Sequence, residues 1–186
     1  MKKNVFLVLT LAAIISTGCG SDEPDNPKEV KVTSATAEYY LSVTPDVVKF
    51  MDITVQYMTD NNPQHLGTFE MKAPQMEFTS TEIKNEVQLS QPARFGIKGK
   101  ITPLPDVSVD QEANYTFGVI VRATIKGYDK DGKEVVLDGP NEDTHKEQIV
   151  KGTEIDDFLK RIQMASNLFN RGWFVNADGT LKPGLI

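Results

Sequence analysis

The sequence contains a single cysteine, Cys19, among its 186 residues. One thiol excludes an intramolecular disulfide, so we expect the folded part of the chain to be stabilised by the burial of apolar side chains. Histidine is scarce too, because His65 and His145 are the only two and lie far apart in the sequence. Zinc sites need several such ligands at short spacings. The sequence therefore predicts no metal and no other cofactor, and both histidines are expected in surface loops.

Clusters of basic residues are also missing. The chain has 20 Lys and Arg residues against 26 Asp and Glu residues, which gives a net charge of −6. Proteins that bind nucleic acid carry clustered Lys and Arg for the phosphate backbone, so we expect no nucleic-acid partner. No stretch outside residues 1–18 approaches the roughly 20 apolar residues of a membrane-spanning helix.

Motifs of catalysis are lacking as well. The sequence has no G-x-S-x-G nucleophile elbow and no phosphate-binding P-loop. Glu142-Asp143 and Asp156-Asp157 are pairs of adjacent acids, whose side chains point to different sides of the chain and form no acid–base pair by themselves. A glycosidase-like catalytic pair made of two acids distant in the sequence is an alternative that the sequence leaves open. The segment Asp129–Gly132 has its glycine fourth, whereas a calcium loop needs it sixth, so it fits a hairpin turn. We therefore predict a protein without catalytic activity.

The chain begins with the parts of an export signal. Lys2 and Lys3 supply a positive start, and Val5–Ile15 form an apolar stretch that is too short to span a membrane. The small residues Ser16–Gly18 follow, directly before Cys19. Cleavage at this point would remove both lysines and take the net charge from −6 to −8. An ordinary secretory cleavage also fits, but it would leave a lone reactive thiol at the new N-terminus.

The segment Ser16–Cys19 resembles the lipobox of bacterial lipoproteins, with Ser16 where leucine is usual. The resemblance implies that Cys19 is lipidated and anchors the protein to a membrane. Gly20–Asp25, a serine followed by acids, is similar to the surface-export signal of lipoproteins of the Bacteroidota, and a generic polar tether is the alternative. The chain as a whole resembles the small surface lipoproteins of that group. This implies an outer-membrane location facing the cell exterior.

These signals divide the chain into three parts. Residues 1–18 are expected to be a cleaved signal peptide, and residues 19–30 the lipidated cysteine with a flexible acidic tether. Residues 31–186 remain for a single domain, which is long enough for a core of its own.

Apolar residues recur at every second position in the first part of this domain. Four longer segments show this alternation: Ala35–Val43, Met51–Tyr57, Phe95–Ile101 and Tyr115–Ile125. Shorter candidate strands are Phe69–Met71, Met76–Phe78, Val87–Leu89 and Val135–Leu137, while Thr81–Leu89 stays open between strand and helix. Period two with one apolar face predicts antiparallel strands that are buried on one side. Seven or eight of them predict a β-sandwich of immunoglobulin-like type.

Turn signals separate the predicted strands. Thr44–Asp46, Asp60–Pro63 and Pro103–Asp106 each contain proline, and proline cannot donate to a central ladder. Asp129–Lys133 contains Asp-Gly between two strand patterns, which predicts a tight hairpin.

The period changes in the C-terminal segment, where an amphipathic helix is expected at about 153–171. Its apolar face would consist of Ile155, Phe158, Leu159, Ile162, Ala165 and Phe169. Thr153 would cap its start, Gly172 would take the left-handed position after its end, and Trp173 would pack on Leu168. Leu181–Ile186 would form a short tail or an edge strand.

Two aromatic residues are candidates for ligand binding. Trp173 is the only tryptophan, and its alternative to packing on the helix is an exposed ring that serves a ligand. Tyr40 points away from the face that carries Tyr39 and Tyr57, which we expect in the core.

The predicted function is a non-catalytic surface module that binds a glycan or an envelope protein, because sandwiches commonly present binding sites on their loops. The alternative is a structural or assembly subunit, of fimbrial type or accessory to a complex, that acts through its C-terminal segment.

Overall fold

The computed structural model describes residues 32–140, 143–165 and 167–186. The predicted signal peptide, Cys19 and the tether lie outside the described residues. The strands are β1 (Ser34–Val43), β2 (Met51–Met58), β3 (Leu66–Met71), β4 (Glu77–Thr79), β5 (Ile83–Glu86), β6 (Ala93–Pro103), β7 (Asn114–Tyr128), β8 (Glu134–Val135), β9 (Thr144–Lys151), β10 (Phe169–Val175) and β11 (Leu181–Gly184). The helices are α1 (Pro45–Phe50) and α2 (Ile155–Met164), and the 3-10 turn η1 (Gly152–Glu154) precedes α2.

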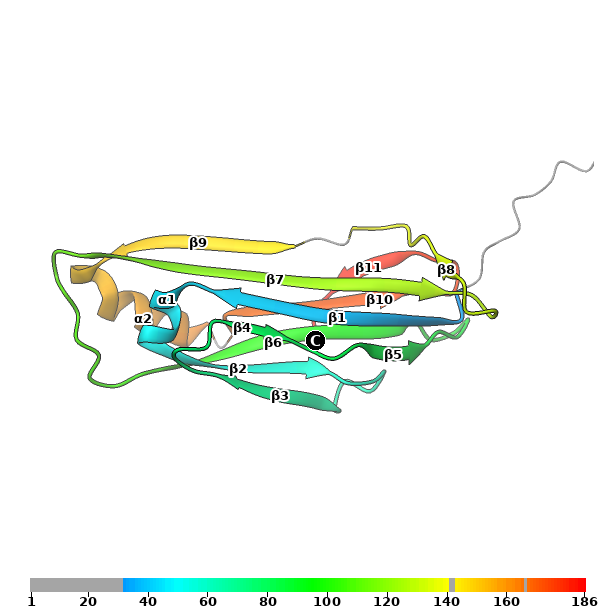
Figure 1. Cartoon of the computed structure of the whole chain (residues 1–186), viewed down its shortest axis with the longest axis horizontal. Coiled ribbons are helices and arrows are strands. Elements are labelled where there is room, and N and C mark those ends of the chain that lie inside the picture. Colours follow the sequence, from blue (N-terminus) through cyan, green and yellow to red (C-terminus); the bar gives the residue numbers. More distant parts are fainter. Residues whose placement is uncertain (1–31, 141–142, 166) are drawn as a thin grey trace, which may run out of the picture.

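The strands form two antiparallel sheets that pack face to face (Figure 1). Sheet A has the order β4-β1-β7-β8, with β5 also paired to β1 and β9 also paired to β7. Sheet B has the order β11-β10-β6-β2-β3. The predicted fold class, a mainly β antiparallel sandwich with one amphipathic helix near the C-terminus, is confirmed.

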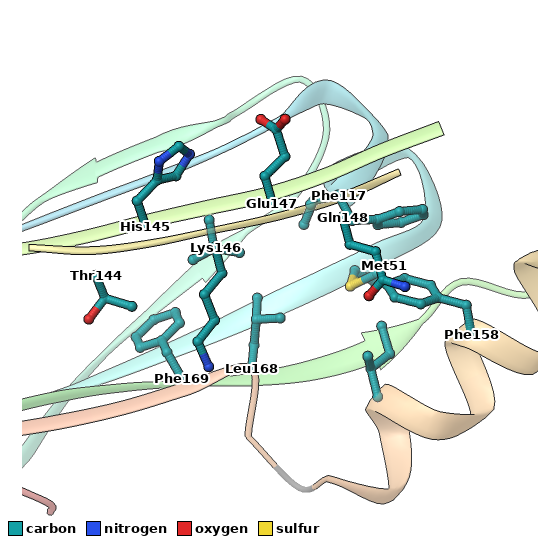
Figure 2. A pocket seen from close by; sticks show the side chains of 13 residues that line it. Met51, Phe117, Thr144, His145, Lys146, Glu147, Gln148, Phe158, Leu168 and Phe169 are labelled. Carbon is teal, nitrogen blue, oxygen red and sulfur yellow. The ribbon is translucent and has the colours of Figure 1, made fainter. Parts of the chain in front are cut away.

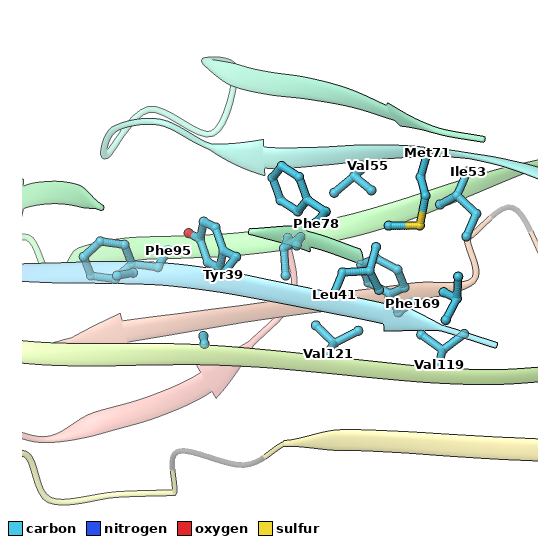
Figure 3. Packing of buried hydrophobic residues seen from close by; sticks show 14 of the residues in the cluster. Tyr39, Leu41, Ile53, Val55, Met71, Phe78, Phe95, Val119, Val121 and Phe169 are labelled. Carbon is cyan, nitrogen blue, oxygen red and sulfur yellow. The ribbon is translucent and has the colours of Figure 1, made fainter. Parts of the chain in front are cut away.

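Strand β7 is the longest and organises sheet A. It pairs with β1 from Ser34↔Tyr128 to Val43↔Val119, and with β9 at its other end. The alternation seen in the sequence sends every second side chain of β1 and β7 into the space between the sheets. There they meet inward residues of β2, β6 and β10 in one continuous core (Figure 3).

Tyr39 connects the two sheets through the middle of this core. Its side chain is 0% exposed, and its hydroxyl accepts a 2.7 Å hydrogen bond from the N–H of Gly96 in β6. Burial raises the pKa of the Tyr39 hydroxyl well above its usual range. The hydroxyl therefore stays neutral in the folded protein, and it satisfies a backbone donor of the opposite sheet.

Tyr39→Phe is expected to lower the free energy of unfolding by about 1–3 kcal/mol, because the Gly96 N–H would be left buried without an acceptor. The wild-type protein, which keeps the Tyr39 hydroxyl, should also lose stability above about pH 10. There the tyrosine ionises in the unfolded chain while its raised pKa keeps it neutral in the folded one, so rising pH favours unfolding. Denaturant unfolding followed by circular dichroism at neutral and alkaline pH measures both effects.

Tyr40→Phe is the matched control, because the Tyr40 hydroxyl bonds to Glu77 at the surface. An alkaline loss of stability in Tyr39→Phe that equals the wild-type loss would contradict the role given to Tyr39.

The predicted turns Thr44–Asp46 and Asp60–Pro63 follow strands β1 and β2, but Pro103 of the third predicted turn is the last residue of the central strand β6, opposite Met51, so excluding it from a central ladder was wrong. The turn after β1 contains a short helix that the sequence did not predict. The Thr44 hydroxyl accepts a 2.9 Å hydrogen bond from the N–H of Gly118 and donates to the carbonyl of Thr116. The Asp46 carboxylate accepts a 2.6 Å hydrogen bond from the N–H of Thr116. These bonds fasten α1 to β7.

The Asp129–Lys133 hairpin is confirmed, since β7 and β8 pair on either side of it. The carboxylate of Asp129 accepts hydrogen bonds from the N–H groups of Lys133 and Asp131, which hold its pKa below the usual range. Gly132 has φ +77°, a left-handed conformation that glycine adopts without strain. Thr81–Leu89, which the sequence left open, contains strand β5.

The helix predicted for residues 153–171 is too long, and this part of the prediction was wrong. Helix α2 ends at Met164, and Phe169–Val175 form strand β10, which pairs with β6 from Phe169↔Gly99 to Val175↔Ala93. Phe169 fits the helical spacing, but it also starts a period-two pattern with Trp173 and Val175, and all three are buried. Pairing with β6 satisfies the backbone of this segment and decides between the two patterns.

The end of the predicted helix is corrected as well. Gly172 lies in extended β10 opposite Gly96, so it is not a helix-ending residue. Glu154, and not Thr153, precedes the first residue of α2. The segment predicted as a tail or edge strand forms edge strand β11. Neither helix in the described ranges has the length and apolar character needed to cross a membrane.

Candidate functional site

A groove of about 510 Å³ opens between β9 and helix α2 (Figure 2). Eight apolar residues line it: Val47, Met51, Phe117, Val119, Phe158, Ile162, Leu168 and Phe169. The remaining lining residues are the consecutive Thr144–Gln148 of β9. We call this feature the β9 groove. Its volume falls within the roughly 300–1,000 Å³ of pockets that hold small ligands.

The apolar wall is built by elements that are distant in the sequence. Alternation in β7 turns Phe117 and Val119 inward, and Phe158 of α2 packs on Phe117 with ring centroids 4.4 Å apart. The connection after α2 then brings Leu168 and Phe169 to the same space. The groove is therefore an extension of the sandwich core that reaches the surface.

Strand β9 contributes the polar side of the groove. Its Lys146 and Gln148 pair with Val119 and Phe117 of β7, and residues opposite each other in an antiparallel pair share one face. Both side chains therefore point between the sheets, as Figure 2 shows, while His145 and Glu147 point the other way. Lys146 and Gln148 are nevertheless exposed, whereas their partners on β7 are buried. The sandwich is open at this edge.

The two ends of the groove are bounded. At one end the Arg171 side chain of β10 donates a 2.7 Å hydrogen bond from Nε to the hydroxyl of Thr144, which ties sheet B to the start of β9. At the other end, Phe158 and Ile162 of α2 close the space between the sheets. Between these ends the wall is apolar, and Lys146 is the charged side chain that β9 directs inward.

Trp173 does not form an exposed platform. Its side chain is 3% exposed, and its ring stacks on Tyr39 with centroids 6.3 Å apart and an interplanar angle of 29°. The candidate role of Trp173 as an exposed ligand-binding ring is therefore wrong, and so is its expected contact with Leu168. The cause is β10, whose alternation turns Trp173 into the core.

Tyr40 lies on the outer face of sheet A, away from the β9 groove. Its hydroxyl donates a 2.9 Å hydrogen bond to Glu77, and the Arg122 guanidinium lies 6.0 Å from its ring centroid. Arg122 in turn pairs with Asp143 at 2.7 Å. The prediction that Tyr40 points away from the core is confirmed, but Arg122 occupies one face of its ring.

The histidines lie at the surface in different settings. His65 is in a loop, as predicted, with Nδ1 2.7 Å from Asp60. His145 is exposed but belongs to β9, so its expected loop position was wrong. Within the described ranges no three His, Cys, Asp or Glu side chains are grouped so that they could hold a metal ion.

The sequence did not predict the β9 groove. Strand β9 reads THKEQIVK, which lacks the apolar alternation that identified β1 and β7. The side chains of α2 and β10 that complete the wall were assigned to one long helix. Comparisons with protein-family models, with curated proteins and with solved structures gave no significant match.

Proposed function

We propose that the protein is a lipid-anchored, non-catalytic module of the cell envelope that binds another protein through the β9 groove. The observation that carries the proposal is an apolar groove that continues the core to the surface at an open edge of the sandwich. Apolar grooves of this kind suit the anchoring side chains of a protein partner. The resemblance of Ser16–Cys19 to a lipobox supports the membrane anchor, and Gly20–Asp25 supports its outward-facing location in the outer membrane.

A protein partner is favoured over a glycan because of the surface chemistry. The large hydrophobic side chains exposed in the described ranges are Met76, Leu89, Val136, Ile149, Met164 and Leu185, and none of them is aromatic. A sugar is polar on most of its surface and needs convergent polar groups, whereas eight of the thirteen residues that line the groove are apolar.

A non-catalytic role is supported by the orientation of the acids. Hydrolytic sites built on carboxylates need two of them facing one substrate. Glu147, the acidic residue that β9 contributes to the groove lining, points away from it (Figure 2).

Site-specific crosslinking in the native host tests this function. A photoreactive amino acid in place of Lys146, at the mouth of the groove, is expected to give an adduct of discrete mass on whole cells. The same amino acid in place of Lys84, an exposed lysine on β5 of the same sheet, is the matched control. No adduct at position 146, or the same adducts at both positions, would contradict the proposal. Mass spectrometry of the mature N-terminus tests whether Cys19 is acylated. Protease shaving of whole cells tests whether the protein is exposed at the cell surface.

The alternative of an assembly subunit retains one supporting observation. The outer side of α2 presents Glu154, Asp157, Lys160, Arg161 and Met164 around a shallow depression, and Met164 is 84% exposed. Such a surface would suit a contact with a further subunit. This alternative predicts self-association or co-purification that changes at these exposed residues abolish.

A further inference from the structure

We infer that the β9 groove receives an extended peptide segment, which adds a strand to the free edge of β9 and places alternate apolar side chains in the groove. This inference rests on the proposed function and specifies the form of the partner. It is carried by the combination of two features, an unpaired strand edge and the apolar groove beside it.

The first feature is the edge itself. Strand β9 pairs with β7 on one side, and no other strand of the described ranges pairs with it on the other. Its eight residues pair with β7 without interruption from Thr144↔Val121 to Lys151↔Asn114, so it has neither a bulge nor a proline. Backbone N–H and C=O groups of alternate residues therefore face outward along its length.

Other edges of the sandwich are less suited to strand addition. Strand β4 has three residues, and β11 has four, including Pro183. Short edges and proline are the ordinary means by which proteins prevent pairing with other chains. Strand β9 has neither protection, and it is also longer than the six-residue edge strand β3.

The second feature is the position of the groove. A strand added to β9 would lie about 4.8 Å from it and would turn every second side chain toward sheet B. Those side chains would enter the space bounded by Ile162, Leu168 and Phe169. Backbone hydrogen bonds along the edge would then supply affinity, and the groove would select apolar residues at alternate positions.

Lys146 gives the site a charge preference. It is an inward-pointing charge on an edge strand, a device that discourages indiscriminate pairing. No side chain of the described ranges pairs with its ammonium group, and the apolar wall of the groove supplies no anion. A carboxylate next to it would form an ion pair, so the expected partner segment has an acid among its inward-facing residues.

The outer face of β9 adds a further preference. Ile149 is 65% exposed and stands between Glu147 and Lys151 on that face. Residues directly opposite each other in a ladder interact favourably when both are apolar or oppositely charged. The partner segment is therefore expected to place an apolar residue opposite Ile149.

Selection from a randomised peptide library tests the inference. The full-chain protein is used to select from displayed peptides of about ten residues, roughly the length of a strand. The winning peptides, those enriched in the selection, are expected to carry apolar residues at every second position and an Asp or Glu among them. Amide hydrogen exchange with a winning peptide should protect every second amide of β9, namely those that do not bond to β7. Lys146→Glu should weaken binding of acid-bearing winners roughly tenfold or more, and Lys84→Glu on β5 should leave it unchanged.

Three results would overturn the inference. The first is selected peptides whose apolar residues recur at helical spacing. The second is selected peptides that bind but leave the amides of β9 unprotected. The third is a selection in which no peptide is enriched. The crosslinking test separates this inference from the proposed function. An adduct at position 146 with unprotected β9 amides would retain the groove as a protein-binding site and overturn strand addition. Protection of β9 by library peptides with no adduct on cells would support strand addition and contradict the proposed function.

Discussion

A chain that ends after Gly152 is expected to lose its cooperative fold. The missing residues include β10, which lies between β6 and β11 in sheet B, so its removal exposes one side of β6. They also include six buried apolar side chains: Ile155, Phe158, Phe169, Trp173, Val175 and Leu181. Burial of such side chains contributes roughly 1.5–3 kcal/mol each, so about 9–18 kcal/mol would be lost. That is as large as the roughly 5–15 kcal/mol by which whole domains are stable.

Circular dichroism, denaturant unfolding and the dispersion of amide resonances measure this loss. Removal of Leu185 and Ile186 alone is the control, because Leu185 is 68% exposed and Ile186 is joined to Asn170 by two hydrogen bonds. That shorter deletion should weaken the protein but leave a cooperative transition. A stable, cooperatively folded chain without residues 153–186 would contradict the arrangement of sheet B.

This result affects how the assembly alternative can be tested. Loss of a partner after deletion of the C-terminal segment would report unfolding, since β10 belongs to the core of sheet B. Changes restricted to exposed residues of α2, such as Lys160 or Met164, are needed instead.

Trp173→Ala is expected to lower the free energy of unfolding by about 3–5 kcal/mol, the usual cost of truncating a large buried aromatic side chain. The ring of Trp173 is stacked on Tyr39, whose hydroxyl joins the two sheets, so the cavity would open beside that connection. Denaturant unfolding followed by circular dichroism measures the change, because the variant has no tryptophan fluorescence.

Two further variants control for this effect. Trp173→Phe keeps most of the buried volume and should lose less stability than Trp173→Ala. Met164→Ala removes an exposed side chain at the end of α2 and should change stability by at most about 0.5 kcal/mol. A Trp173→Ala effect as small as that of Met164→Ala would show that the ring is at the surface.

Sequence reasoning predicted the strands in which burial and period coincide. In β1, β2, β6 and β7 one face is apolar at every second residue, and the structure buries that face. Alternation alone therefore recovers the sandwich. It does not predict strand order, because pairing partners such as β1 and β7 are separated by about seventy residues of chain.

Strand β9 was not predicted from the sequence, and the physical reason is its open edge. An edge strand with an open side needs no apolar alternation, since half of its inward positions face solvent. Lys146 and Gln148 occupy those inward positions, and because both are polar the sequence of the strand shows no apolar alternation. Its extended form is fixed by pairing with β7, a long-range contact that local sequence does not encode.

The C-terminal error arose from one residue that satisfied two periods. Phe169 lies seven residues after Ile162, which matches a helical face, and it also begins the alternation of β10. The helical interpretation then placed Gly172 and Trp173 at a helix end. Since the wall of the β9 groove requires α2 to stop before Leu168, the same error concealed the site.

The direction of β1 determines how the protein would respond to a pulling force. Strand β1 begins beside Tyr128, at the end of the sandwich with the β7–β8 hairpin, and ends beside Val119, which lines the groove (Figure 1). Tension between an anchor that enters ahead of β1 and a partner held on β9 would slide β1 against β7 along their common axis. All ten residue pairs from Ser34↔Tyr128 to Val43↔Val119 would then share the load. Pairs loaded together must break together, so this register would resist unfolding of β1 under such a tension.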